Sequence, residues 1–237
     1  MVVDLITVAV ALDDPLRAGL WTNFYLAYHG LSDRHLQVKT AALYRRLLPS
    51  LDHVAPHCGQ ARPPGGKIRV GLISRFFHNH SIGRTSRGLF AQISPDEFEV
   101  TGIFIAPTVD DEFSRFIRRH AARCVEVPQD LAAARRLIGE LRLDILFYQD
   151  IGMEPFTYFL AFSRLAPVQC VSFGHPDTTG IPSMDWFVSN DLYETAAAPA
   201  HYSERLFLLR NLGSLAYYYR PEMSPQPRSR AELGLPE

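Results

Sequence analysis

The chain contains 237 residues, of which 47 % are hydrophobic and 21 % are charged, and its formal net charge is -1. This composition supports a packed core and excludes an extensively disordered chain. The near-neutral charge gives no reason to expect a nucleic acid or a membrane surface as a partner, and no apolar run approaches the ~20 residues of a membrane span. The three cysteines lie far apart, which is typical of reduced thiols in a cytoplasmic protein.

Residues 1–62 are expected to form a helical segment. Between residues 33 and 48 a stripe of side chains recurs every three or four positions, which is typical of a helix with one buried face. The stripe consists of Leu36, Thr40, Leu43 and Leu47. A second helix is expected over residues 15–28. Because two short helices bury little by themselves, we expect this segment to pack against the rest of the chain or to continue a helical array.

The Pro-Pro-Gly-Gly sequence of residues 63–66 is predicted to be a linker, and the hydrophobic pattern changes after it. Seven short apolar runs then predict strands at residues 68–74, 98–106, 124–127, 144–148, 168–173, 186–189 and 206–209. Helical patterns lie between several of them, at residues 110–122, 129–141 and 155–164. This alternation predicts an α/β fold with a parallel sheet, a Rossmann-like lobe over residues 67–220.

Three loops of this lobe carry the candidate catalytic residues. Open α/β sheets bind ligands at the carboxyl ends of their strands, where the strand order reverses, and the first and fourth strands are commonly neighbours there. The loops after the first, fourth and fifth strands carry His80, Asp150 and His175, which we therefore expect to converge on one rim. Histidine can accept or pass a proton near neutral pH, and a carboxylate can orient it or act as the base.

The loop after the fifth strand is rich in glycine, proline and hydroxyl groups. Its residues of interest are Gly174, Pro176, Thr178, Thr179 and Gly180. The two threonine hydroxyls, with backbone N–H groups left free by the glycines, could hold sugar hydroxyls or a phosphate. Structural alternatives stay open at this point: each histidine could have a structural role, Asp150 could cap the next turn, and the threonine pair could be only a turn.

No metal site is predicted. His53, His57 and Cys58 are ligand types for zinc, but no second cysteine pair completes a site. The glycine-rich dinucleotide fingerprint and the phosphate-binding loop are both absent from the sequence.

Four segments, in order, resemble the O-GlcNAc transferase family, including its plant SPINDLY-like and bacterial members. They are residues 67–83 with Asn79-His80-Ser81, residues 165–180 with Gly174-His-Pro-Asp-Thr-Thr-Gly180, Met184-Asp185, and residues 201–206. The resemblance covers roughly residues 67–221. The helical residues 1–62 fit the connector that joins the family's tetratricopeptide repeats to its catalytic region.

The resemblance implies an enzyme with two lobes, a GT-B glycosyltransferase. Such enzymes transfer a sugar from a UDP-sugar, usually UDP-GlcNAc, to serine or threonine of acceptor proteins, without a metal or another cofactor. It implies that His80, flanked by Asn79 and Ser81, lies beside acceptor and sugar, and that residues 174–180 line the same cleft. Residues 221–237 resemble the lead-in to a second lobe that this chain lacks. We therefore expect the chain alone to be nearly inactive, because that lobe supplies the charge facing the diphosphate.

Two departures leave the donor and acceptor open. The Gly-His-Pro sequence and Ile151-Gly152-Met153 resemble the bacterial branch with HMW1C-like protein N-glucosyltransferases, which glucosylate asparagine. The alternatives from other classes are a non-catalytic protein-binding module with the same fold and an unrelated sugar-nucleotide enzyme.

Overall fold

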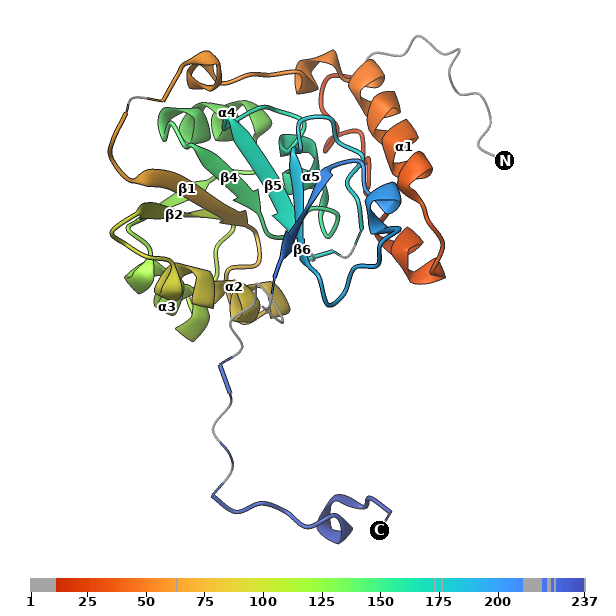
Figure 1. Cartoon of the computed structure of the whole chain (residues 1–237), viewed down its shortest axis with the longest axis vertical. Helices are drawn as coiled ribbons and strands as arrows, with labels where there is room; N and C mark the ends of the chain where they lie inside the picture. Colours follow the sequence, from red (N-terminus) through yellow and green to blue (C-terminus); the bar gives the residue numbers. More distant parts are fainter. Residues whose placement is uncertain are drawn as a thin grey trace.

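A seven-stranded parallel sheet forms the centre of the molecule (Figure 1). The computed structural model describes residues 12–62, 64–172, 174–175, 177–210, 219–220, 223 and 225–236. The strands are β1 (Ile68–Ser74), β2 (Phe98–Ile105), β3 (Arg123–Val127), β4 (Ile145–Tyr148), β5 (Val168–Ser172), β6 (Trp186–Asn190) and β7 (Arg205–Leu209). Their order is β3-β2-β1-β4-β5-β6-β7, and every neighbouring pair is parallel. The predicted α/β Rossmann-like fold is confirmed, with the order reversing between β1 and β4.

Helices cover both faces of the sheet (Figure 1). They are α2 (Ser81–Gln92) and α3 (Glu112–His120) on one face, and α4 (Leu131–Glu140) and α5 (Pro155–Leu160) on the other. Because successive side chains of a strand point to opposite faces, β1 contributes Leu72 to the core under α2 and α3, and Ile73 to the core under α4 and α5. None of the helices in the described ranges is long and apolar enough to cross a membrane.

Helix α2 is absent from the sequence prediction, which treated residues 77–83 as a loop and continued to the second strand. Its buried face carries Ile82, Ser86 and Phe90 at a spacing of four, with glycines between them. Gly83 packs against the backbone of His78, where an added Cβ would overlap the carbonyl oxygen. Because much of the buried face consists of small and polar residues, the sequence lacks the regular spacing of apolar residues by which a helix is predicted.

The amino-terminal segment packs onto the same core as the sheet. Helix α1 (Arg34–Leu47) confirms the predicted helix, and short 3-10 turns occur at Phe24–His29, Pro49–Leu51 and Pro56–Gly59. Further turns of this kind lie at Ala198–His201 and Ala231–Leu233. The side chains of Ala41, Leu48 and Leu51 are fully buried in the core that also holds α4 and α5. The predicted packing of this segment against the rest of the chain is therefore confirmed.

The continuous helix predicted over residues 15–28 is wrong. Residues 15–19 form turns, and Gly19 adopts φ 65°, a left-handed conformation that interrupts a right-handed helix. Only the 3-10 turn Phe24–His29 has helical backbone, and Gly30 ends it with φ 66°.

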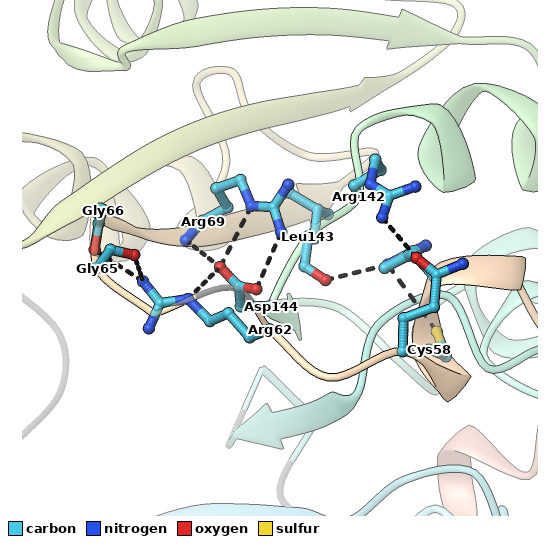
Figure 2. A network of polar contacts seen from close by, with 10 residues as sticks. Cys58, Arg62, Gly65, Gly66, Arg69, Arg142, Leu143 and Asp144 are labelled. Carbon is cyan, nitrogen blue, oxygen red and sulfur yellow. Dashed lines mark hydrogen bonds and ion pairs between the residues drawn. The ribbon is translucent and has the colours of Figure 1, made fainter.

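The Pro-Gly linker is attached to the sheet by one carboxylate, that of Asp144 (Figure 2). Asp144 lies just before β4 and accepts hydrogen bonds from the backbone N–H of Arg69 at 2.8 Å and from its guanidinium at 3.1 and 3.3 Å. Arg62 approaches the same carboxylate at 3.5 Å and donates to the carbonyl of Gly66 at 2.8 Å. Burial alone would raise the pKa of Asp144, but the hydrogen bonds and charge of Arg69 and the charge of Arg62 hold it below its usual value.

Candidate active site

His80 lies at the carboxyl edge of the sheet, where the chain leaves β1 and enters α2. It is the N-cap of α2, and its Nδ1 accepts a hydrogen bond from the backbone N–H of Ile82 at 3.2 Å. Its ring stacks on Phe76, with the ring centres 4.4 Å apart. These two contacts fix the plane and the direction of the half-buried imidazole.

The cap also fixes where the proton of His80 resides. Because Nδ1 accepts from a backbone N–H, the neutral imidazole carries its proton on Nε2. Among the described residues, no hydrogen-bond partner reaches Nε2. Burial and the neighbouring His78 lower the pKa of His80, which favours the neutral imidazole. The rim therefore presents an imidazole N–H donor at the amino end of a helix.

The residues on either side of His80 are exposed, and their backbone is held in place. The Asn79 backbone N–H donates to the carboxylate of Asp111 at 2.6 Å, and its side-chain oxygen accepts from Arg84 at 2.7 and 3.1 Å. Asp111 caps α3 by accepting from two further N–H groups, at 2.9 and 3.0 Å. Burial alone would raise the pKa of Asp111, but these three N–H donors lower it. Ser81, exposed, is the first residue of α2.

Asp150 lies under this rim. It is fully buried, and its carboxylate accepts from the Ser74 hydroxyl and the Arg75 backbone N–H, both at 2.8 Å. Burial and the nearby Glu154 raise the pKa of Asp150 to about 7. The side chain thus fixes the end of β1, and the expectation that it meets His80 on an open rim is wrong. It does not cap the next turn either, because Glu154 caps α5.

His175 is also at the predicted edge, but its side chain is covered. It is 5 % exposed, its Nε2 lies 2.7 Å from the carbonyl oxygen of Phe24, and its ring stacks on the Phe24 ring at 4.6 Å. Gly152 packs beside it with φ 95°, where a Cβ would lie 2.9 Å from Nδ1. Burial lowers the pKa of His175. The expectation of an open histidine at the mouth of this loop is wrong, because the turn Phe24–His29 covers it.

The two threonine hydroxyls are bonded within the protein. Thr178 donates to the carboxylate of Glu204 at 2.7 Å, and Thr179 donates to it from its backbone N–H at 2.9 Å and from its hydroxyl. Gly180 adopts φ 70° and donates its N–H to the Ser203 hydroxyl at 3.1 Å. The expectation that these hydroxyls are offered to a ligand is wrong in this structure. Pro176 lies outside the described residues.

The three loops do meet, as the sequence predicted. Gly174 is the contact point: an added Cβ would overlap the carbonyl oxygen of Gln149 and would lie 3.2 Å from the side chain of Ile82. The loops after β4 and β5 and the start of α2 therefore touch at one place. Of the candidate side chains, His80, Asn79 and Ser81 face the surface there.

Arg75 is a rim residue that the sequence reasoning missed. Its side chain is 36 % exposed at the end of β1 and lies 3.8 Å from the carboxylate of Glu154. Arg75 directly follows the first strand, and this position is the sequence signal by which it could have been identified as a rim residue. Among the described residues, no group of three or more histidine, cysteine, aspartate or glutamate side chains is arranged to hold a metal ion.

Comparison with known proteins places these features in context. No protein-family model matches the chain. Over 128 residues, 53 % of the chain, it is 30 % identical to a UDP-glucose:protein N-beta-glucosyltransferase of Actinobacillus pleuropneumoniae serotype 5b. Over 176 residues, 72 % of the chain, it is 22 % identical to a probable UDP-N-acetylglucosamine–peptide N-acetylglucosaminyltransferase of Arabidopsis thaliana. The chain spans about a fifth of these relatives, 20 % and 18 % of their lengths.

A solved structure supports the same relationship at the level of the fold. A mutant of the Thermobaculum terrenum O-GlcNAc transferase is similar with a TM-score of 0.60 and 23 % sequence identity, over 74 % of this chain and 33 % of that one. The family resemblance predicted from the sequence is confirmed by these findings. The chain is thus similar in sequence to two kinds of protein glycosyltransferase, and it shares its fold with an O-GlcNAc transferase structure.

Proposed function

We propose that this chain is the acceptor-side lobe of a UDP-sugar-dependent protein glycosyltransferase that transfers N-acetylglucosamine to serine or threonine of acceptor proteins. The observation that carries the proposal is the geometry of His80: its Nδ1 accepts from the Ile82 N–H at the start of α2, which leaves Nε2 without a partner among the described residues. The activities of the two relatives support both a UDP-sugar donor and a protein acceptor.

Sugar transfer breaks the bond from the sugar C1 to the diphosphate and forms a bond from C1 to the acceptor oxygen. Negative charge develops on the leaving diphosphate, and the proton of the acceptor hydroxyl passes to an oxygen of that diphosphate or to water. A helix amino terminus carries partial positive charge, and donors fixed before the reaction stabilise developing charge strongly. In this proposal α2 and the Nε2–H of His80 add to the stabilisation of the diphosphate that the second lobe supplies. Arg75 adds a cation at the same edge.

His80 is proposed as a donor and not as the base. A base would need a free lone pair on Nε2, which moves the proton to Nδ1. That proton would then face the backbone N–H of Ile82, from which Nδ1 now accepts. We further propose that Asn79 and Ser81 contact substrate, since both are exposed beside His80.

The buried candidates are proposed to position the rim. Asp150 fixes the end of β1, His175 fixes the loop after β5 on the amino-terminal segment, and Glu204 holds Thr178 and Thr179. We also propose that a second lobe completes the UDP site and that transfer needs no metal ion.

Transfer of glucose to asparagine is a second candidate. One observation favours it: two of the curated relatives, at 30 % identity, are UDP-glucose:protein N-beta-glucosyltransferases.

The test measures transfer by the longest protein that the coding sequence specifies. Radiolabelled UDP-N-acetylglucosamine and UDP-glucose are each offered with peptides that carry serine and threonine or asparagine as acceptors. His80→Ala is expected to slow transfer roughly 100-fold or more, the effect of losing one donor to developing charge. His120→Ala is the matched control, because His120 is an exposed histidine at the end of α3, bonded only locally to Phe116.

Labelling of the serine and threonine peptides from UDP-N-acetylglucosamine supports the first candidate, and labelling of asparagine from UDP-glucose supports the second. An unchanged rate for His80→Ala removes this residue from the mechanism. No labelling and no UDP binding by calorimetry would favour a protein-binding module with the same fold.

A further inference from the structure

The amino-terminal segment exposes several large apolar side chains. Trp21, Tyr25, Tyr28 and Leu31 are each between 69 % and 77 % exposed. The rings of Tyr25 and Tyr28 lie 6.2 Å apart, and they contact the ring of Phe24 at 5.2 and 5.8 Å. We call the four exposed residues the aromatic surface. Clusters of exposed apolar side chains mark interaction sites, and tyrosine and tryptophan are enriched in protein interfaces.

Helix α1 lies beside the aromatic surface and is positively charged. Tyr44 of α1 donates a hydrogen bond to the carbonyl of Trp21 at 2.9 Å, and Asn23 donates to the Thr40 hydroxyl of α1 at 3.1 Å. The helix contains no aspartate or glutamate. Its basic residues are Arg34, Lys39, Arg45 and Arg46. A helix that carries cations and no anions attracts negatively charged groups.

Three of these cations, those of Arg34, Lys39 and Arg46, are available to a partner. All three are exposed, and none of them forms an ion pair with a residue that the structure describes. Asp33 precedes the helix, but it is 7 % exposed and its carboxylate lies 3.4 Å from the Gln37 amide, so its charge faces the protein interior. Because the whole chain has a formal net charge of -1, the positive potential on α1 is a local feature.

The amino-terminal segment also contacts the loop that reaches the candidate active site. Phe24, which lies under the aromatic surface, stacks on His175 at 4.6 Å, and Gln37 of α1 donates to the Asp177 carboxylate at 2.8 Å. The same loop touches the start of α2 at Gly174. The aromatic surface and α1 therefore flank the candidate active site.

We propose that this surface docks an acidic segment of the acceptor protein, with carboxylates of that segment on Arg34, Lys39 and Arg46 and an apolar side chain on the aromatic surface. The inference rests on the proposed function, because it takes the acceptor to be a polypeptide. Complementary charge speeds the encounter and selects the partner. Nucleic acid is a poorer match, since strongly salt-dependent binding to it involves about six to ten phosphate contacts, and α1 offers far fewer unpaired cations.

A fluorescent peptide with a serine and a leucine among glutamates is the probe, and the peptide with glutamines in place of the glutamates is the comparison. Binding to the 237-residue chain is followed by fluorescence anisotropy. The acidic peptide is expected to bind more tightly, by a margin that falls as salt is added. Trp21→Ala is expected to weaken its binding about fivefold or more, the usual effect of removing a tryptophan from the centre of an interface.

The charge variant is Arg34→Gln/Lys39→Gln/Arg46→Gln. It is expected to weaken binding of the acidic peptide about tenfold, since each exposed ion pair contributes about a factor of two. The control variant removes the same charges from exposed residues that also lack an ion pair in the described part of the chain, in α3 and next to β1 and β3, away from α1 (Figure 1). It is Lys67→Gln/Arg119→Gln/Arg123→Gln.

Weaker binding by the charge variant, with unchanged binding by the control variant, supports the proposal. Equal binding of the two peptides, equal losses in the two variants, or tighter binding of an oligothymidylate of the same charge overturns it. Because the readout is binding, it separates this inference from the glycosyltransferase proposal. Transfer with the same KM for both peptides overturns only the docking surface, whereas binding of the acidic peptide without any transfer refutes only the transferase.

Discussion

The structure makes Glu204 the residue that holds the Thr-Thr-Gly loop. Glu204 is only 6 % exposed, and its carboxylate accepts from Thr178 and twice from Thr179. A hydrogen bond to a charged group contributes about 1.5–3 kcal/mol, and a buried donor left without its acceptor costs about 1–3 kcal/mol. We expect Glu204→Ala to lower the free energy of unfolding by about 4 kcal/mol, because the two threonines lose their acceptor and a hollow is left.

The measurement is urea unfolding, followed by thermal unfolding of the same samples. For a chain of this length, about 4 kcal/mol corresponds to a fall in Tm of roughly 8–16 °C. Glu204→Gln is expected to lose less, because its amide oxygen still accepts from the Thr179 N–H. Glu140→Ala is the control, since Glu140 is 61 % exposed in its pair with Arg136 and should change stability by less than about 0.5 kcal/mol. A loss below about 1 kcal/mol for Glu204→Ala would refute the reasoning that this carboxylate organises the loop.

Two further changes test the contact between the amino-terminal segment and the loop after β5. Gly180→Ala should lower the free energy of unfolding by about 3 kcal/mol or more, because φ is 70° and the new Cβ would overlap the backbone of Gln37. Gly19→Ala is the control: φ is 65° but the space around it is open, so the loss should be only about 1 kcal/mol. Similar losses for the two variants in urea unfolding would contradict this reasoning. Burial, with a hydrogen bond and charge from Asp33, raises the pKa of Asp177 to about 7 from 3.8. Its contribution to stability is therefore fully present below about pH 4 and is lost as the pH rises through about 7. Asp177→Asn should reduce the fall in Tm between about pH 4 and pH 7, and an unchanged pH profile would exclude Asp177 as its source.

The sheet could be predicted because each strand is a short apolar run between clear breaks. The prediction placed β1 at its observed bounds and the other strands within a residue or two. Helix α2 was not predicted, because its buried face consists of Ser86 and glycines as well as Ile82 and Phe90. A helix with such a buried face can be identified only from the residues that it packs against. Those residues lie elsewhere in the chain, so the local sequence does not reveal the helix.

The sequence predicts that the loops after β1, β4 and β5 meet at one edge, and they do, but it does not predict which of the candidate side chains are exposed. Topology alone brings the ends of β1, β4 and β5 together, so His80, Asp150 and His175 were expected on one rim. Whether each side chain faces solvent depends on partners far away in sequence. Phe24 covers His175 and Ser74 binds Asp150, contacts 151 and 76 residues apart along the chain. No local pattern encodes them.

The Pro-Gly linker has a consequence for how the molecule is divided. Residues 12–62 lie before the linker, yet they pack into the hydrophobic core that holds α4 and α5, and they cover the side chain of His175. A fragment starting at residue 67 would lose the residues that cover His175. It would also expose to solvent the apolar surface against which Ala41, Leu48 and Leu51 pack. The linker therefore does not separate two independently packed units, and α1 contacts the loop after β5 directly, through the 2.8 Å hydrogen bond from Gln37 to Asp177.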